Sequence, residues 1–315
     1  MATGVTVGDA GALLSTGDGG ATWTSRENGA GAEMLDLAST DSLHAWAVGT
    51  FGNTQYTTDG GANWTSLVVG NPFGHLYGVD FLNASRGWLV GDGDQSNNYG
   101  VIYRSTNGGK AWGLQFSGGS LTQMYDVDAI NSSTAVAVGN LGIIWRTTDG
   151  GLTWQQVPHP SVTSVLSGVE FKGKVGYVTG NSGAILKSRD RGATWVTVRV
   201  GAENLMDISF ADRLNGWAVG FDGVILHTTN AGRTWKLQPG PGASVALLGV
   251  QAISSTTAWI SGGPAQGYVA RTLDGGATWT QELLPGDPLS ISAIEFRTAD
   301  EGWAAGYIGV WHRTV

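Results

Sequence analysis

Short apolar runs separated by glycine and small polar residues fill this chain and come in groups of four. In one group, residues 76–81 (LYGVDF) and 87–91 (GWLVG) are followed by a third apolar run and, after a tryptophan, by a fourth. β-Branched and aromatic residues bounded by Gly and Asn predict strands, and no segment keeps helical spacing over three turns. We therefore expect an all-β protein and name the four strands of each group A to D in chain order.

A phrase that ends in tryptophan connects strand C to strand D and recurs along the chain with a nearly fixed period. Its tryptophans lie 40 to 48 residues apart. A period in the forties that is made of four short strands is typical of a β-propeller. Because the period runs from end to end, we expect one propeller domain over residues 1–315. The seven copies occupy residues 16–23, 57–64, 105–112, 147–154, 188–195, 228–235 and 272–279.

The two ends of the chain do not complete a repeat. The chain opens on residues that resemble strands B and C, at 4–8 and 12–14, and it closes on strands A, B and C at 294–296, 302–306 and 309–313. The total of thirty strands fits neither seven nor eight four-stranded blades evenly. We predict seven blades, with eight as the alternative, and a closing blade that mixes N-terminal and C-terminal strands.

The recurring phrase has a structural explanation that needs no chemistry. An Asp or Asn side chain can accept hydrogen bonds from the backbone of its own turn, and the Gly two residues later supplies a positive φ without steric cost. A Ser or Thr two residues earlier can add a second local bond. We therefore expect a structural role for the Asx positions, which are Asp18, Asp59, Asn107, Asp149, Asp190, Asn230 and Asp274.

The phrase resembles the Asp-box, or bacterial neuraminidase repeat, whose pattern is S/T-x-D-x-G-x-T-W. The Gly-Trp-x-Val-Gly run before each box, as at 87–91 and 216–220, makes the chain similar to photosystem II stability/assembly factor-like propellers. This resemblance implies a non-enzymatic scaffold that binds another macromolecule, most often a protein, through arginine-rich surfaces. Asp-box proteins also include sialidases and xyloglucanases, so a glycan-binding propeller or a glycoside hydrolase is the alternative.

Composition narrows the classes of function. The net charge of −8 and the pI near 5.0 argue against a nucleic-acid-binding surface. No apolar run is long enough to insert into a membrane, and the absence of cysteine excludes disulfides and thiolate metal sites. Low charge with abundant Thr, Ser, Gly and Asn favours an extracytoplasmic protein of a bacterium. We find no signal peptide at the start of the chain.

Two rows of charge emerge when the repeats are aligned. Basic residues stand immediately before the boxes at Arg104, Arg146, Lys187, His227, Arg271 and Arg313. Acidic residues stand in strand A at Asp80, Asp128, Glu170 and Glu295, and about one pleat earlier at Asp36, Asp126 and Asp207. One interpretation is that the two rows neutralise each other between blades. The other is that the Arg and Lys members of the basic row bind an acidic partner.

The loops opposite the boxes carry the remaining candidates. Their aromatic and polar side chains would suit a peptide or a carbohydrate, and they include Phe51, Phe73, His75, Phe221, Asp222 and Tyr307. If the protein is a hydrolase, Asp36, Asp126 and Asp207 are the candidate catalytic carboxylates, because they would lie near the channel mouth. The triple-arginine pattern of sialidases is missing.

We expect no cofactor and no metal. The insertion at residues 91–100 supplies hard oxygens in Asp92, Asp94 and Asn97, which could hold Ca²⁺. It lacks the distal bidentate acid of a dedicated calcium loop, so a solvated turn is the favoured interpretation.

Overall fold

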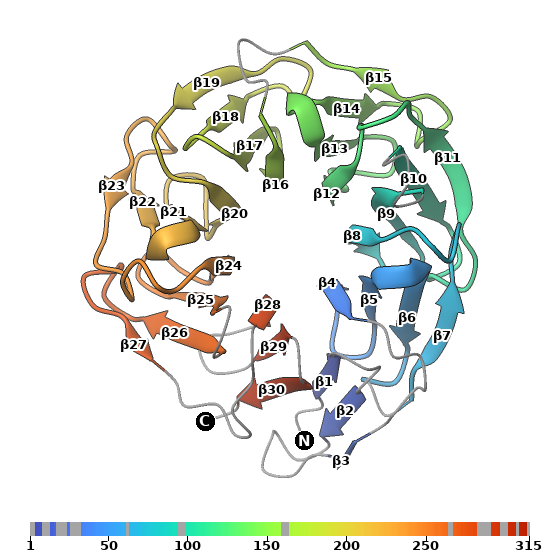
Figure 1. The fold of residues 1–315 in the computed structure, drawn as a ribbon, viewed down its shortest axis with the longest axis horizontal. Coiled ribbons are helices and arrows are strands. Elements are labelled where there is room, and N and C mark those ends of the chain that lie inside the picture. The colour runs from blue at the N-terminus through green and yellow to red at the C-terminus, as the bar shows by residue number, and fades with distance from the viewer. Residues whose placement is uncertain are drawn as a thin grey trace.

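In the computed structural model, blades of antiparallel strands stand around a central channel (Figure 1). The structure describes residues 4–7, 13–16, 24–25, 33–60, 63–93, 99–158, 164–263, 267–281, 291–296, 302–306 and 309–313; for residues 4–25, 296 and 302–313 it describes the backbone only. An all-β propeller is therefore confirmed.

Six sheets have four strands each, with strand A next to the channel and strand D at the outside. Their strands are β4 (Met34–Ser39), β5 (Ala45–Gly49), β6 (Asn53–Thr57) and β7 (Thr65–Val68); β8 (Leu76–Asn83), β9 (Arg86–Asp92), β10 (Gly100–Ser105) and β11 (Gly113–Ser117); β12 (Met124–Asp128), β13 (Ala135–Gly139), β14 (Ile144–Thr147) and β15 (Gln155–Gln156); β16 (Leu166–Lys172), β17 (Val175–Gly180), β18 (Ile185–Ser188) and β19 (Val196–Arg199); β20 (Leu205–Phe210), β21 (Gly216–Gly220), β22 (Ile225–Thr228) and β23 (Lys236–Leu237); β24 (Leu247–Ala252), β25 (Ala258–Gly262), β26 (Tyr268–Thr272) and β27 (Thr280–Gln281).

The prediction of seven four-stranded blades, or alternatively eight, is wrong, because the structure has six. The first and last strands form two separate three-stranded sheets instead of one mixed closing blade. These are β1 (Gly4–Val7), β2 (Leu13–Thr16) and β3 (Thr24–Ser25), and β28 (Ile291–Phe296), β29 (Gly302–Gly306) and β30 (Gly309–Arg313).

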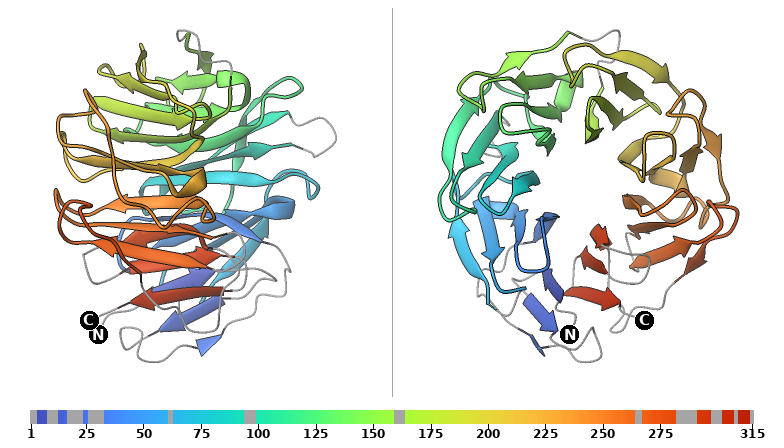
Figure 2. Two further views of the ribbon diagram at one scale, coloured as in Figure 1. Left: turned by 60° about the vertical axis from the view of Figure 1, so that its left-hand side comes forward. Right: turned by 180° about the vertical axis from the view of Figure 1, so that it is seen from behind.

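The reason for this arrangement is local pairing. Among the described strands, β3 is the one candidate to complete the last sheet as strand D, and it is already bonded to β2. The strands of each terminal group pair with their own neighbours in the chain, so the two groups meet without sharing a sheet. β1 lies beside β29 and β30, where the two ends of the chain meet (Figure 2).

Large aromatic side chains of strand B fill the space between blades, as their burial on both faces requires. Trp46, Trp88, Trp217 and Trp259 are all buried, and Tyr177 takes the same position in another blade. The Trp46 ring stacks on Phe81 of the next blade with centroids 3.5 Å apart. Its Nε1 donates to the Gly108 carbonyl in the next box at 2.9 Å. Neighbouring blades are thus joined by an apolar stack with a polar end.

Each described box closes on itself and on its own blade. Thr147 Oγ1 donates to Asp149 Oδ1 at 2.8 Å and accepts from Gly151 N at 2.8 Å. Asp149 also accepts from the backbone and hydroxyl of Thr153, and these bonds lower the pKa of its carboxyl to about 2. The Gly150 N–H then binds the Ser133 carbonyl in the turn between strands A and B at 2.8 Å. The box is a clasp between two turns of one blade.

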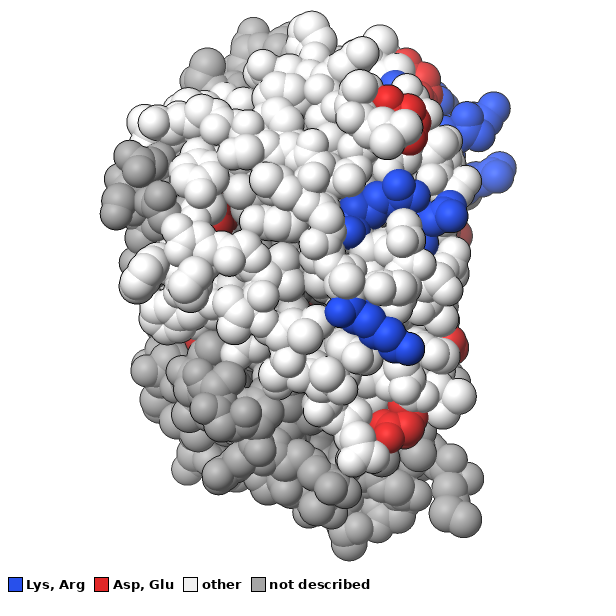
Figure 3. Space-filling view, turned by 90° about the vertical axis from the view of Figure 1, so that its right-hand side faces the viewer, with Lys and Arg blue, Asp and Glu red and all other residues white. Residues whose placement is uncertain are grey.

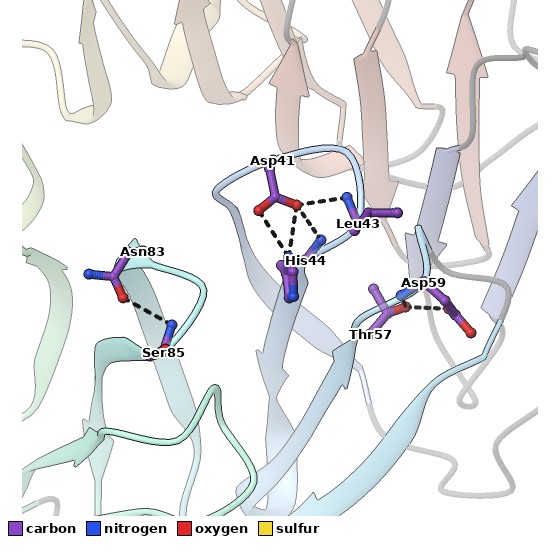
Figure 4. Close-up of polar contacts among 7 residues, drawn as sticks. All are labelled: Asp41, Leu43, His44, Thr57, Asp59, Asn83 and Ser85. Carbon is purple, nitrogen blue, oxygen red and sulfur yellow. Dashed lines mark hydrogen bonds and ion pairs between the residues drawn. The ribbon is translucent and has the colours of Figure 1, made fainter.

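The same bonds recur around the ring. The remaining described boxes, with Asp59, Asn107, Asp190, Asn230 and Asp274 at the Asx position, keep the same Ser/Thr–Asx pair, as Figure 4 shows for Thr57 and Asp59. The facing A–B turns have Asx turns of their own, such as the one in which Asp41 accepts from Leu43 N and His44 N. Asp18 lies outside the described residues.

The buried hydroxyl of Thr147 accepts a hydrogen bond from Gly151 N, and we expect loss of this hydroxyl to destabilise the fold. Replacing Thr147 with Val keeps the shape and leaves the buried Gly151 N–H without its acceptor, which costs about 1–3 kcal/mol. Chemical denaturation should show this decrease in the free energy of unfolding. Thr148→Val, at the exposed neighbouring position, is the matched control, and an equal effect of both changes would contradict the clasp.

Candidate functional site

The loops divide between two faces of the ring. The box face carries the Asp-boxes and the A–B turns. The channel-mouth face carries the B–C turns and the D–A loops, which bind each other, as when Gly52 N donates to the Gly74 carbonyl at 2.8 Å. Three B–C turns are short 3₁₀ segments, η2 (Thr50–Gly52), η3 (Asn140–Gly142) and η4 (Phe221–Gly223), seen in front of the blades in Figure 1.

These turns hold bulky side chains in a left-handed backbone conformation. Phe51 has φ 61° and Leu141 has φ 56°, and each precedes a Gly of positive φ. Glycine adopts this conformation without strain, whereas a bulky residue does so at a cost in free energy. Phe51 and Leu141 remain 49% and 53% exposed. Burial in their own blade therefore does not offset the strain.

Strand A forms the inner edge of each blade, where alternate backbone N–H groups have no partner strand. Acidic side chains supply the missing acceptors. Asp126 Oδ1 accepts from Val127 N of its own strand at 2.7 Å, and its Oδ2 accepts from Val169 N of the next blade at 2.7 Å. The acidic row therefore bonds one inner strand to the next. The other such pairs are Asp36–Val79, Asp80–Ala129, Asp128–Phe171, Glu170–Phe210 and Asp207–Val250.

The carboxylates form two tiers along the channel. The upper tier, near the channel-mouth face, has Asp36, Asp126 and Asp207 on alternate blades, with Gly78, Gly168 and Gly249 at the same position of the blades between them. A Cβ on Gly78 would lie 2.8 Å from the Cα of Asp126. Glycine therefore allows the next inner strand to approach. Carboxylates and glycines alternate at this position through the six four-stranded blades, and Ala293 takes it in the last sheet.

The lower tier, toward the box face, holds Asp80, Asp128, Glu170 and Glu295. Lys172 Nζ pairs with Glu170 Oε1 at 2.8 Å. Among the described residues, this is the one ion pair between a basic side chain and the acidic row. Glu295 Oε1 accepts from Ser39 Oγ at 3.1 Å, which links the last strand A to the first. This bond closes the circle of inner strands.

Burial raises the pKa of the channel carboxyls. Desolvation raises the pKa of Asp36 and Asp207 to about 7, of Glu295 to about 7 and of Asp80 to about 6. The pKa of Asp126 is raised well above its ordinary value by burial and by the nearby Asp36 charge. The backbone N–H groups oppose the shift, and they do not outweigh the loss of water.

A cavity of about 640 Å³ opens at the channel mouth. Its wall is a ring of side chains that all occupy one position of strand A, directly before the upper tier: Leu35, Tyr77, Tyr125, Ser167, Met206, Leu248 and Ser292. Asp36, Asp126 and Asp207 lie below this ring, and Phe221 and Asn181 reach it from the B–C turns. The three aspartates lie near the channel mouth, as predicted from the sequence, whereas the ring of residues before them was not predicted.

Basic residues in the row before the boxes stack on strand-B aromatic side chains instead of pairing with the acidic residues of strand A. Arg104 and Arg271 lie over the rings of Trp88 and Trp259, at 5.4 and 5.6 Å from the ring centroids. His227 stacks on Trp217 at 4.2 Å. Each lies directly across from its aromatic partner on strand B. The row therefore extends the aromatic stack of strand B outwards onto strand C.

Two members of the row also bind the next box. Arg146 Nε donates to the Arg191 carbonyl at 2.7 Å, and the buried Lys187 Nζ donates to the Ala231 carbonyl. Arg313 is paired with Gly302, one residue out of register with the others, and the structure describes only its backbone.

Most of the described Lys and Arg side chains lie on the box face, where the aspartates of the boxes also lie. Figure 3 shows Lys and Arg side chains gathered along the edge that lies away from η2–η4. Exposed cations that the sequence analysis did not single out add to the row: Lys110, Arg189, Arg191, Arg213, Arg233 and Lys236. Of the Lys and Arg side chains that the structure describes, Arg199 alone belongs to the channel-mouth face, and it pairs with Glu203 at 2.9 Å.

The remaining residues singled out in the sequence lie on the channel-mouth face or outside the described residues. Phe73 is 70% exposed and Phe221 39% exposed, Asp222 is exposed and His75 is half-buried on the channel-mouth face. Tyr307, Asp94 and Asn97 lie outside the described residues. The Asp92 carboxylate is buried and accepts from His75 N and Tyr77 Oη, so it serves the fold. Within the described ranges there is no group of His, Asp or Glu side chains suited to a metal ion, and no helix could cross a membrane.

The hydrolase alternative finds little support in this geometry. Asp36, Asp126 and Asp207 each accept one backbone N–H on one oxygen and a second on the other. A general acid or a nucleophile needs an oxygen that is free for the substrate.

The channel carboxyls predict an unusual dependence of stability on pH. Between about pH 4 and about pH 7 the folded protein holds protons that the unfolded chain has released, so the free energy of unfolding falls as pH rises through this window. Each carboxyl contributes about 1 kcal/mol or more. Asp207→Asn should reduce the slope of melting temperature against pH, whereas Asp222→Asn, at an exposed site, should not. A wild-type melting temperature that stays level or rises across this window would contradict the assignment.

Comparison with known proteins supports the architecture. Structures titled YCF48 bound to D1 peptide (22% identity) and YCF48 from Cyanidioschyzon merolae (19% identity) both superpose with a TM-score of 0.69, each over 90% of this chain and over 92% and 95% of theirs. U3-55K, at 7% identity, superposes equally well over 90% of this chain and 95% of its own, which shows shared fold alone. A search of curated proteins found no match. The family model described as photosynthesis system II assembly factor YCF48 matches residues 1–122, 119–203 and 198–308, and the chain therefore belongs to this family.

Proposed function

We propose that this protein is a non-enzymatic propeller that binds a protein partner through its box face. The main support for this proposal is that most of the described Lys and Arg side chains lie on the box face. The chain also matches an assembly-factor family over nearly its whole length. A similar structure is titled as bound to a D1 peptide, which supports a polypeptide as the ligand class.

The box face provides suitable chemistry for an acidic segment. Arg104 and Arg146 are half-buried, with their stems packed against the blade. The Arg104 guanidinium lies over the Trp88 ring and beside Gly150 of the next box. A guanidinium held in this way offers several N–H donors to a carboxylate without losing much side-chain entropy on binding. Lys187 is buried and already bonded, so we assign it to the fold rather than to the partner.

The cellular location and the glycan alternative stay proposals. We propose an extracytoplasmic location in a bacterium, which rests on the low charge and on the abundance of small polar residues. Glycan binding would have to use the tyrosines of the channel mouth rather than the box face.

Changing the two arginines tests the docking face. Arg104→Gln with Arg146→Gln keeps the side-chain stems and removes two charges, each worth about 1.5–3 kcal/mol when hydrogen-bonded to an acid. We expect the immobilised wild-type protein to retain a protein from extracts of its source organism and also a D1 peptide in titration. The double variant should bind at least tenfold more weakly.

Arg199→Gln is the control, because it removes one positive charge from the opposite face. It should retain the same partner as the wild type. Equal retention by the double variant and the wild type, with both proteins folded, would rule out the box face as the docking site.

A further inference from the structure

We propose that the channel mouth is a second binding site, which receives a lysine or arginine side chain of a partner polypeptide on the face opposite the boxes. The proposal is independent of the docking of an acidic segment on the box face. It rests on the shape, charge and unsatisfied polar groups of the cavity.

The wall of the cavity is mostly apolar. Leu35, Met206 and Leu248 contribute aliphatic surface, and Tyr77 and Tyr125 contribute rings whose centroids lie 5.4 Å apart. A cavity of about 640 Å³ with apolar walls and a few convergent polar groups is the usual form of a ligand site. The aliphatic stem of a long cationic side chain would be covered by such a wall.

An aromatic row leads from the surface to this wall. The exposed Phe51 ring lies 5.7 Å from the His75 ring, His75 lies 5.9 Å from Tyr77, and Tyr77 is followed by Tyr125. Aromatic faces attract an ammonium or guanidinium group. Phe51, which is exposed and has a strained backbone, lies at the outer end of the row, where its ring could contact an arriving partner.

The floor of the cavity holds three carboxyl groups and lacks a counter-charge. Asp36, Asp126 and Asp207 accept hydrogen bonds from backbone N–H groups, and burial raises their pKa, so a cation bound beside them would draw them into the ionised form. No Lys or Arg is among the described residues that line the cavity, and Lys172 lies at the other end of the channel. A cation that enters the mouth would therefore meet an attractive field focused by protein walls of low polarity.

A buried hydroxyl supplies a second and independent sign of a ligand. Ser261 Oγ is fully buried and has no hydrogen-bond partner among the described residues. It lies 2.8 Å from the position that a Cβ on Gly249 would take, and Gly249 lines the cavity. The hydroxyl therefore packs against Gly249 at a distance that a side chain at residue 249 would not allow. Thr179 Oγ1, also buried and without a partner, lies 2.9 Å from the corresponding position at Gly168.

The hydroxyls of Thr179 and Ser261 thus lie beside two of the glycine positions between the carboxylates, and Val90 stands beside the third. The remaining lone pairs of the carboxylates can accept from an ammonium group with three donors. A metal ion is a poor match, because the described carboxylates do not converge into a coordinating group. The exposed Phe73 and Leu141 on the same face add apolar surface around the mouth, which suits a polypeptide rather than a free amine.

Titration with short capped peptides tests the proposal. The probe is an acetylated and amidated pentapeptide with a central lysine flanked by glycine and alanine, and the matched peptide has norleucine in place of lysine. Calorimetry should show the lysine peptide binding at least tenfold more tightly than the norleucine peptide. n-Butylammonium chloride, which has the same cation without a chain, should bind more weakly than the lysine peptide.

Variants locate the binding. Leu248→Lys places a tethered ammonium group in the mouth and should abolish binding, and Asp207→Asn should weaken it at least fivefold. Asp222→Asn, an exposed acid outside the cavity, and the double variant Arg104→Gln with Arg146→Gln should bind the lysine peptide as the wild type does. The last control separates this site from the docking face.

Three results would overturn the proposal. They are equal affinity for the lysine and norleucine peptides, binding that is unchanged in a folded Leu248→Lys protein, or butylammonium binding as tight as peptide binding. Circular dichroism and melting temperature establish folding in each case, and Leu248→Met serves as the folded control if Leu248→Lys does not fold.

Discussion

The unpaired inner edge of each blade is the constraint on which this structure depends. Arranging sheets around a channel leaves strand A with N–H groups that no strand can satisfy, and burying them without acceptors would cost free energy at every blade. Acidic side chains supply those acceptors and reach across to the next blade, as Asp126 does for Val169. The acidity of the channel therefore follows from the geometry of the ring.

At the box face, each blade is held by hydrogen bonds of the Asp-box. The box binds the A–B turn of its own blade, while Trp46, Arg146 and Lys187 bind carbonyl groups in the box of the next blade. Bonds within a blade and bonds between blades thus meet in one loop. Most of the described cations gather at the box face, whereas carboxyl groups without a neighbouring cation line the channel mouth. This difference separates the two proposed binding sites.

Much of the fold could be predicted from the sequence, because it is encoded locally. Strands, box clasps and the burial of the strand-B tryptophans follow from residue type and period. The number of blades did not follow, because it depends on whether β3 pairs with β2 or completes the sheet of β28–β30, and residue patterns do not encode that choice between competing strand pairs. The role of the basic row was missed because a residue directly across from Trp88 or Trp217 stacks on it before it meets a carboxylate.

The ring at the channel mouth shows why a site can be hidden in a regular pattern. Strict alternation would send neighbouring residues such as Leu35 and Asp36 to opposite faces. A bulge at this point in strands A from β4 to β28 lets both line the channel. The position after the bulge is constrained by its bonds to the next blade. Those bonds do not need the position before the bulge, so its side chain can vary while the ring stays closed. Specificity for a ligand can therefore arise at this position.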